Sequence, residues 1–298
     1  MLTQTECIPC ILDDLVGAIK LLNLPLRDSE RILSEALLYL GEIPKFQFIP
    51  PHHITRVHRI LKRISGIDLP FLQLRYNCNR VGIELASRIS RECDNFSNSE
   101  RFASLVRWSI AGNLLDFRTA GAGYGLEIRN IERMLRDKAK KGLQVDNTVA
   151  LYNLLRDGGR KVLYILDNVG EIAMDGILIN EMVKLRNSVT ATVRGGVITS
   201  DVTVDDAKDV DLASSGVAVV AEASDTLGLS WEEKTKEITA LLNGVDAVVA
   251  KGQANFCVFS EHKEEIPGSI FCLFTTKCEL VSGIFGFKEK VSLAVRLK

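Results

Sequence analysis

Hydrophobic positions recur at helical spacing through the first half of the chain. The clearest repeat is made by Ile11, Leu12, Leu15, Val16, Ile19 and Leu22, which form the apolar stripe of an amphipathic helix. Similar repeats follow Ser29, His53 and Pro70. Ser97 and Glu100 have the spacing of a capping box and predict a further helix start. We therefore predict that residues 8 to about 156 are mainly helical.

From residue 162 onward, short apolar runs alternate with amphipathic segments. The strand candidates are residues 162–166, 188–193, 216–221, 246–250, 269–274 and 291–296. Helical segments lie between most of them, notably residues 203–212 and 231–242. This alternation predicts a mainly parallel sheet with helices on both faces. The expected α/β architecture is a helical N-terminal domain over residues 1–156, followed by an α/β domain over residues 157–298 that carries the site.

Composition narrows the class of protein. The 298 residues are 46% hydrophobic and 25% charged, which is the balance of a soluble globular protein. A net charge of −1 gives no basis for binding nucleic acid or an anionic membrane. No apolar run reaches the roughly 18 residues of a membrane span, and the first residues do not resemble a signal peptide. We expect a cytoplasmic protein.

Seven cysteines, an odd number in a long chain, do not suggest a secreted disulfide scaffold. Cys7 and Cys10 form a C-x-x-C pair, but no second pair or nearby histidine completes a zinc site. Cys7, Cys10 and Cys278 remain candidates for a second metal site or a redox role. Burial as a small hydrophobic residue is the simpler interpretation for Cys93, Cys257 and Cys272.

Two further patterns carry little functional weight. His52 and His53 precede a predicted helix, where such a pair is more often solvated or capping than metal-binding. Gly121, Gly123 and Gly125 do not follow a strand, so they do not form a dinucleotide-binding fingerprint.

Polar side chains follow four of the predicted strands. Asp167 and Asn168 follow the first, and Asp201 comes after the second. Lys251 and Gly252 follow the run at 246–250, and residues 275–277 (Thr-Thr-Lys) follow the run at 269–274. The carboxyl ends of parallel strands lie along one edge of a sheet, where such folds bind ligands. We therefore expect these side chains to meet.

The residue types at this edge indicate metal and phosphate chemistry. Asp167, Asn168 and Asp201 offer only oxygen ligands, which suit Mg²⁺ or Mn²⁺. Lys251 beside Gly252 suits a phosphate, because the backbone can approach closely and the ammonium neutralises charge. Thr275 could add a donor. Asn113 and Asp116, three residues apart, would share a helix face.

Each of these residues also has a plain structural interpretation. Asp167 or Asn168 could cap the helix that follows, and Asp201 could cap the next one. Lys251 could be a solvated loop lysine, and Gly112 could simply end a helix. Joint occurrence at consecutive strand ends favours a site over these alternatives.

An ordered set of motifs resembles the archaeal branch of the metal-dependent damage-control phosphatases, long labelled domain of unknown function 89. The resemblance spans nearly the whole chain and rests on Cys7-Ile-Pro-Cys10, Gly112-Asn113-Leu-Leu-Asp116-Phe117, Asp167-Asn168-Val-Gly-Glu171, Ser200-Asp201-Val-Thr203, Lys251-Gly252-Gln253-Ala-Asn255-Phe256 and Lys277-Cys278. It implies a Rossmann-like α/β part and hydrolysis of phosphate esters of small metabolites such as sugar phosphates. The activity would need a divalent metal, with Mn²⁺, Ni²⁺ and Co²⁺ favoured over most others.

The resemblance also implies roles for individual residues. Asp167, Asn168 and Asp201 would bind the metal, Lys251 would bind phosphate, and Asn113 and Asp116 would line the same cleft. Ala254 stands where the family usually has a second glycine in the lysine loop, which should stiffen the loop without removing its lysine.

The sequence thus predicts a phosphomonoester hydrolase in which a metal-activated water attacks phosphorus. Asp116 and Glu171 are candidates to orient that water or protonate the leaving group, although Glu171 also suits a helix first turn. Asp167 as a covalent nucleophile is less favoured, because Asn168 rather than a second aspartate follows it. The rival hypotheses are a non-catalytic binding protein for sugar phosphates or nucleotides, and a cysteine-based metal-binding protein. The oligomeric state is not predicted.

Overall fold

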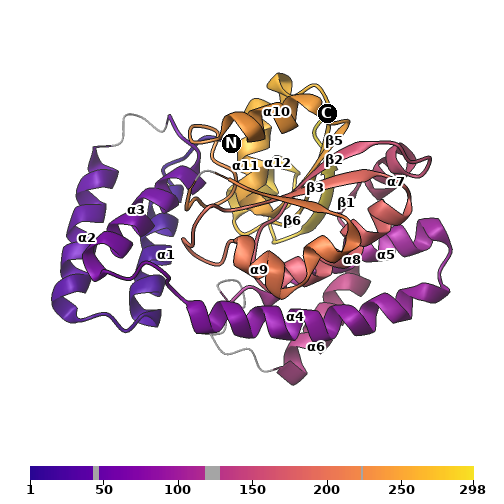
Figure 1. The fold of residues 1–298 in the computed structure, drawn as a ribbon. Helices are drawn as coiled ribbons and strands as arrows, with labels where there is room; N and C mark the ends of the chain where they lie inside the picture. The colour runs from indigo at the N-terminus through magenta and orange to yellow at the C-terminus, as the bar shows by residue number, and fades with distance from the viewer. Residues whose placement is uncertain (43–46, 118–127, 223) are drawn as a thin grey trace.

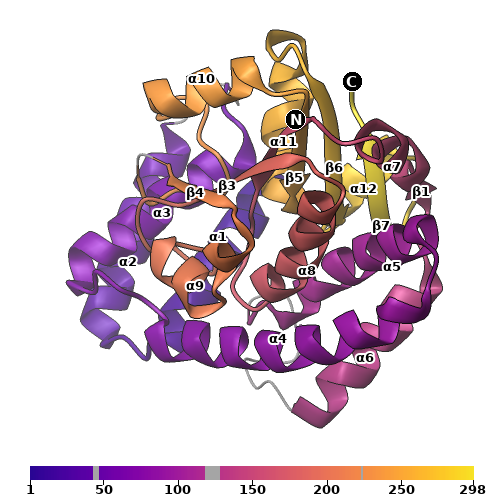
Figure 2. The same ribbon diagram turned by 45° about the vertical axis from the view of Figure 1, so that its right-hand side comes forward.

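The computed structural model describes residues 1–42, 47–117, 128–222 and 224–298, and it contains a twisted sheet with helices on both faces (Figures 1 and 2). The sheet has the order β1-β7-β6-β5-β2-β3-β4 in the described residues. All neighbouring strands run parallel except β6 and β7, which are antiparallel. The predicted α/β class with a mainly parallel sheet is confirmed. The strands are β1 Val145–Asp146, β2 Lys161–Ile165, β3 Ser188–Val193, β4 Ala218–Ala221, β5 Ala247–Lys251, β6 Ser269–Thr275 and β7 Ser292–Arg296.

The described residues form helices through the first part of the chain and between most of the later strands. These helices are α1 Cys7–Leu21, α2 Leu26–Gly41, α3 Pro50–Ser65, α4 Leu72–Glu92, α5 Asn98–Ala111, α6 Ile128–Lys141, α7 Thr148–Leu155, α8 Glu171–Lys184, α9 Val204–Asp209, α10 Lys236–Gly244, α11 Gly252–His262 and α12 Glu279–Ile284, with short 3₁₀ turns η1 Cys93–Asn95, η2 Gly112–Leu115, η3 Leu212–Ser215 and η4 Lys263–Glu265. Within the described parts of the chain, no helix is both long and apolar enough to cross a membrane.

Two details differ from the sequence predictions, and a third confirms one. The helical half contains a short strand, β1, which pairs with β7 at the far end of the chain and therefore has no local sequence signal. The helix predicted at 231–242 begins only at Lys236, because Thr235 caps it by accepting a hydrogen bond from the Ile238 amide at 3.1 Å. The capping box at Ser97 and Glu100 is confirmed.

Alternation along the strands divides the apolar residues between two cores. On β2, Val162 and Tyr164 face one side while Leu163 and Ile165 face the other. The first side packs against α4, α5 and α8, and the second packs against α10, α11 and α12. Strands buried on both faces explain the nearly continuous apolar runs in the sequence.

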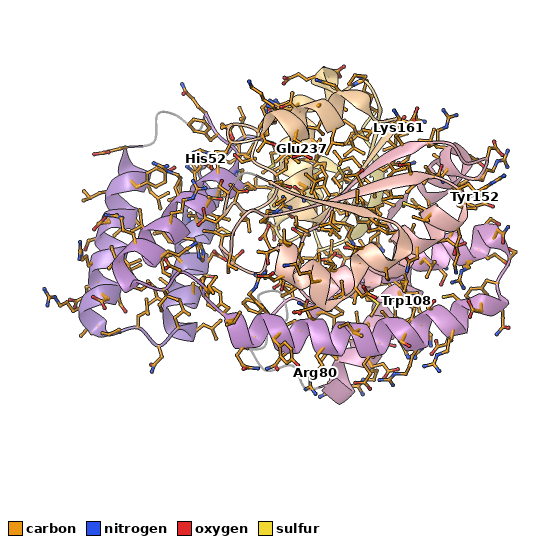
Figure 3. All side chains as sticks on the ribbon, viewed as in Figure 1. His52, Arg80, Trp108, Tyr152, Lys161 and Glu237 are labelled. Carbon is orange, nitrogen blue, oxygen red and sulfur yellow. The ribbon has the colours of Figure 1, made fainter. Side chains whose placement is uncertain are left out.

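The helices α1 to α3 form a unit beside the sheet (Figure 1). Figure 3 shows Lys161, the first residue of β2, on the side of the molecule away from His52 of α3. The carboxyl ends of the parallel strands therefore point toward this three-helix unit. The division into two domains at residue 156 stays a prediction, since α4 and α5 pack directly against α8.

Gly82 allows α4 to lie directly on the turn that precedes α8. A Cβ at Gly82 would lie 2.4 Å from the carbonyl oxygen of Gly170. We expect Gly82→Ala to lower the free energy of unfolding by about 1–3 kcal/mol, because helix and turn must separate. Gly176→Ala is the control, since its Cβ would meet only Leu212 at an ordinary 3.7 Å. It should be neutral or stabilising by up to about 1 kcal/mol. Urea unfolding measures both, and equal effects would contradict the close approach.

His53 should make stability fall on acidification. Its ring is buried and its Nδ1 lies 2.8 Å from the Tyr39 hydroxyl. Burial, with a smaller contribution from His52, lowers the pKa of His53 to about 4 from an ordinary 6.5. Between these values the unfolded chain binds a proton that the folded chain does not, so stability is lost as the pH falls.

Between pH 7 and pH 5 we therefore expect the free energy of unfolding to fall by about 1–2 kcal/mol more in the wild type than in His53→Asn. Urea unfolding at both pH values gives the comparison, and parallel losses would show that His53 protonates equally in both states. The solvated or capping role predicted for His53 is wrong, because its side chain is only 1% exposed.

Candidate functional site

The strand order places a crevice between β2 and β5. β3 and β4 lie on one side of β2, while β5 and β6 lie on the other. Chain connections therefore leave the sheet in opposite directions at this point, where open α/β sheets bind ligands. Asp167 and Asn168 follow β2, and Lys251 ends β5. The predicted site residues of these two strands thus lie at the switch point.

Gly252 brings the start of α11 against the carboxylate of Asp167. Its φ is +80°, and a Cβ added there would lie 1.9 Å from Asp167 Oδ2. Only glycine tolerates both this backbone conformation and this contact. The predicted proximity of Gly252 to the acidic group is therefore present.

The loop after β2 pairs with the loop that carries Asp201. The Val169 amide donates to Ser200 O at 2.8 Å, and the Val202 amide donates to Asp167 O at 2.9 Å. Asn168 and Asp201 consequently form an antiparallel bridge, and the Ser200 hydroxyl donates to Asn168 Oδ1 at 2.9 Å. Backbone pairing therefore brings the three predicted oxygen donors together.

The capping interpretations of these residues are wrong. The residue before α8 is Gly170, with no side-chain cap, so neither Asp167 nor Asn168 serves as one. Helix α9 is capped by Thr203, which forms a capping box with Asp206. Asp201 is thus available for another role.

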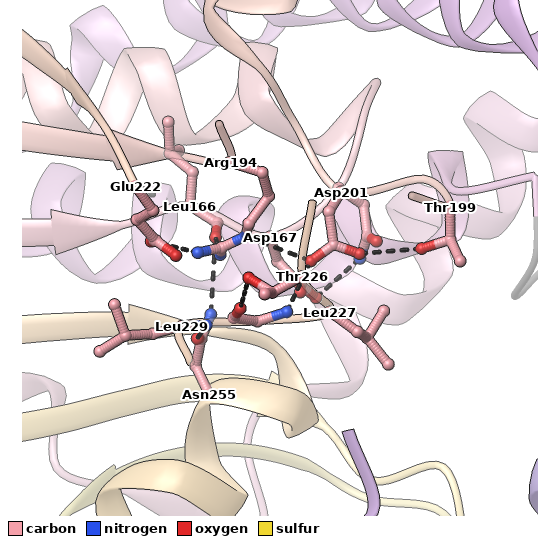
Figure 4. Close-up of polar contacts among 12 residues, drawn as sticks. Leu166, Asp167, Arg194, Thr199, Asp201, Glu222, Thr226, Leu227, Leu229 and Asn255 are labelled. Atoms are coloured by element: carbon pink, nitrogen blue, oxygen red, sulfur yellow. Dashed lines mark hydrogen bonds and ion pairs between the residues drawn. The ribbon is translucent and has the colours of Figure 1, made fainter. Parts of the chain in front are cut away.

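Asp201 is held by a buried arginine (Figure 4). Arg194 Nε lies 3.3 Å from Asp201 Oδ1, and its other nitrogens contact the Glu222 carboxylate and, at 2.6 Å, the carbonyl of Leu166. Asp201 also accepts from the Gly228 amide at 2.8 Å and from the Thr199 hydroxyl at 3.0 Å. Arg194 therefore ties together the ends of β2, β3 and β4.

Two polar residues of α4 fix the same loops from the other side. Arg75 donates to the carbonyl oxygens of Thr199 at 2.8 Å and Asp201 at 2.9 Å, and it pairs with Asp206. Asn79 donates to Asp206 at 3.0 Å and accepts from the Gly170 amide at 2.8 Å. Sequence reasoning missed both, because polar residues on a helix ordinarily indicate a solvated face.

Lys251 lies in a buried ion cluster. Its Nζ is 2.8 Å from Glu171 Oε1, 3.0 Å from Asp175 Oδ1 and 2.6 Å from Ser109 Oγ. Burial opposes its charge, but the two carboxylates outweigh that effect and raise the pKa of Lys251. The solvated-lysine interpretation is wrong, and phosphate binding by Lys251 stays a prediction.

The charge balance around Asp167 favours a cation. Burial raises the pKa of Asp167 well above its usual range, and the nearby carboxylates of Glu171 and Asp201 raise it further. Lys277 and Arg194 act in the opposite direction. The positive charges near Asp167 are therefore too few to stabilise its ionised carboxylate.

The oxygen donors retain capacity for such a cation. Asp201 Oδ2 and Asn168 Oδ1 each accept one hydrogen bond, which leaves a second lone pair on each oxygen. Among the described residues, no three His, Cys, Asp or Glu side chains form a metal cluster by themselves. The predicted ligands Asp167 and Asp201 therefore fit a hard cation only together with the amide oxygen of Asn168.

A cavity of about 500 Å³ opens beside Asp167 and Asn168. It lies between α1 and α3 on one side and α11 and α12 on the other, and Lys277 is the lysine among its described lining residues.

The residues predicted to bind the substrate are more dispersed. Asn113 Nδ2 lies 3.4 Å from Glu171 Oε2 and Asp116 is buried, whereas Thr275 lies beside the hydroxyl of Ser292 at 3.2 Å.

The cysteines fall into the two groups that the sequence suggested, one at the cavity and one buried in the core. Cys7, Cys10 and Cys278 all line this cavity. Burial raises the pKa of Cys7 and of Cys10, and Cys278 raises each further. A metal or redox role for the three stays a prediction. The predicted burial of Cys93, Cys257 and Cys272 is confirmed, and Cys78 is buried as well.

One further cation approaches the site from α6. Burial lowers the pKa of Lys138 to about 8, with Glu171, Lys251 and Lys277 among the charges that act on it. The sequence places Lys138 beside Lys140 and Lys141, so nothing distinguished it from a solvated helix end.

Comparison with known proteins identifies the family of this chain. The family described as Damage-control phosphatase ARMT1-like domain matches residues 3–293. A damage-control phosphatase of Archaeoglobus fulgidus is 29% identical over 287 residues, covering 94% of each chain. A damage-control phosphatase of Pyrococcus horikoshii is 27% identical over 283 residues, covering 95% of this chain and 93% of the relative.

An uncharacterized protein of Methanocaldococcus jannaschii is 29% identical over 284 residues, covering 95% of this chain and 91% of the relative. The crystal structure of a DUF89 family protein from P. horikoshii superposes with a TM-score of 0.87 at 25% identity and covers 100% of both chains. The predicted resemblance is confirmed, and the chain belongs to the ARMT1-like damage-control phosphatase family.

Proposed function

We propose that the protein is a metal-dependent phosphatase that hydrolyses a phosphate monoester of a small metabolite. The observation that carries this proposal is the meeting of Asp167, Asn168 and Asp201 beside a 500 Å³ cavity at the switch point of the sheet. Family membership supports phosphatase activity, since two relatives are named damage-control phosphatases.

The oxygen atoms of Asp167, Asn168 and Asp201 would hold the divalent cation, Mn²⁺, Ni²⁺, Co²⁺ or Mg²⁺. Such a cation, when bound, polarises a phosphate oxygen and lowers the pKa of a water molecule. Asn168 orders the acidic groups, because its Nδ2 lies 2.7 Å from Asp167 Oδ2 and 3.2 Å from Glu171 Oε2.

Asp116 or Glu171 would take a proton from the attacking water; Glu171 lies within hydrogen-bond distance of Asn168. Lys251 Nζ lies 2.8 Å from Glu171 Oε1 and would hold this carboxylate in position. Lys277, at the cavity, offsets negative charge on the phosphoryl oxygens. The amides at the start of α11 add favourable dipoles at the same place.

Turnover of p-nitrophenyl phosphate tests the proposal. Activity should disappear on chelation and return with Mn²⁺, Ni²⁺, Co²⁺ or Mg²⁺. Asp201→Asn should lose about 100-fold or more in kcat/KM. Asp205→Asn is the matched control, since this side chain is 87% exposed and pairs with Lys208. Metal-independent turnover would refute the metal's role, and tight phosphate binding without turnover would instead indicate a sensor.

A further inference from the structure

Helix α1 contributes one carboxylate, Asp14, to the described lining of the cavity. Cys7, Cys10, Ile11 and Asp14 line the cavity from this helix, and their spacing of three and four residues places them on one helix face. The Asp14 side chain is 20% exposed, so it is neither fully solvated nor sealed in the core. It lies at the cavity together with Asp167 but is not among the proposed metal ligands.

A buried histidine holds Asp14 in place. His58 Nε2 of α3 lies 2.7 Å from Asp14 Oδ2, and the His58 ring is only 1% exposed. Burial lowers the pKa of His58 to about 4, although the charge of Asp201 acts in the opposite direction, so the imidazole is neutral near pH 7. A carboxylate accepts hydrogen bonds but does not donate them, so Nε2 carries the hydrogen and donates it to Asp14. This hydrogen bond fixes the direction of the carboxylate.

Charge divides the cavity into a phosphate end and an end for the organic part of an ester. Asp167, Asn168 and Lys277 line it together. Burial raises the pKa of Asp167, and the charge of Lys277 opposes this rise, so Lys277 lies near Asp167. A cation and Lys277 would attract a phosphate there, whereas the carboxylate of Asp14 would repel it. The wall at Asp14 therefore suits the organic part.

We infer that Asp14 binds a hydroxyl group on the organic part of the substrate and so favours polyol phosphates over apolar esters, with His58 as the positioning residue of Asp14. This inference rests on the proposed phosphatase function, and it names a residue that determines specificity. A hydroxyl that donates to a carboxylate forms one of the stronger hydrogen bonds in proteins, because the acceptor is charged. An apolar group at the same place would remove water from the carboxylate and return no hydrogen bond.

A cycle of two esters and two proteins tests Asp14 directly. Glucose 6-phosphate and cyclohexylmethyl phosphate both carry a six-membered ring and release a primary alcohol, but only the sugar ester has hydroxyl groups on its ring. With Mn²⁺ present, we expect the ratio of kcat/KM for glucose 6-phosphate to kcat/KM for the cyclohexyl ester to fall at least about tenfold in Asp14→Ala. The loss should come mainly from a higher KM for the sugar ester. Asp13→Ala is the matched control, since this neighbouring side chain is exposed and is not in the described lining.

Variants of His58 test the positioning role. His58→Leu removes the donor and should lower the same ratio by about threefold or more, whereas His58→Gln keeps an amide donor and should restore most of it. Urea unfolding of both variants shows whether the ratio follows the donor or the stability of the fold. An unchanged ratio in His58→Leu, or equal losses in the two variants, would refute the positioning role.

Two results would overturn the role of Asp14 while leaving the phosphatase function intact. One is an equal ratio in Asp14→Ala and the wild type, and the other is a wild type that hydrolyses the cyclohexyl ester but not glucose 6-phosphate. If p-nitrophenyl phosphate and both esters resist hydrolysis, the phosphatase function itself fails. Calorimetric Kd values of the two esters in the wild type and Asp14→Ala then decide the role of Asp14 by the same ratio.

Discussion

Asp167→Asn should lower kcat/KM for phosphomonoester hydrolysis by about 100- to 1000-fold without unfolding the protein. The substitution keeps the shape of the side chain but removes the charge that would bind the cation. Burial and the carboxylates of Glu171 and Asp201 already disfavour that charge and raise the pKa of Asp167. The free energy of unfolding should therefore stay the same or increase.

Phosphate release and urea unfolding give the two quantities. Asp157→Asn serves as the control, because the Asp157 side chain is 87% exposed ahead of β2. Two results would count against the assignment. One is more than a tenth of wild-type activity in Asp167→Asn, and the other is a loss in free energy of unfolding as large as the free energy that corresponds to its loss in kcat/KM.

Lys251→Met should destabilise the fold by about 3–5 kcal/mol. It removes the cation that lies between Glu171 and Asp175, and both carboxylates stay buried. The expected cost arises from those carboxylates rather than from the lost lysine. The triple variant with Glu171→Gln and Asp175→Asn should therefore recover most of the stability while remaining inactive.

Urea unfolding of the single and triple variants measures this effect. Lys161→Met is the control, because Lys161 begins β2 at the exposed end of the strand (Figure 3). A loss under 1 kcal/mol for Lys251→Met, or no recovery in the triple variant, would show that the ion cluster does not depend on this lysine.

Much of the sheet and the first contacts of the site could be predicted from sequence. Apolar runs located the longer strands, and their parallel order placed Asp167 and Lys251 at one edge. Side-chain roles that depend on local chemistry, such as the capping box at Ser97, were also readable.

What the sequence could not show depends on distant packing. Arg75 and Asn79 reach residues more than 90 positions away, and their spacing gives no sign of burial. The sequence likewise placed Lys251 beside a phosphate, whereas its ammonium lies in a buried cluster with Asp175. That partner comes from the buried face of α8, and the two charges meet only when α8 packs against the sheet.

Strand β1 is another feature that depends on distant packing. Val145 and Asp146 form a strand only because β7 lies beside them. A two-residue strand has no alternation to detect, so its existence follows from the sheet and not from its own residues.

A crystal soaked with Mn²⁺ and measured at the manganese absorption edge tests whether Asp167, Asn168 and Asp201 hold the metal together. We expect an anomalous peak at ordinary metal–oxygen distance, about 2.0–2.4 Å, from side-chain oxygens of Asp167, Asn168 and Asp201. A peak at other residues, or a fully loaded protein without one at these three, would contradict it.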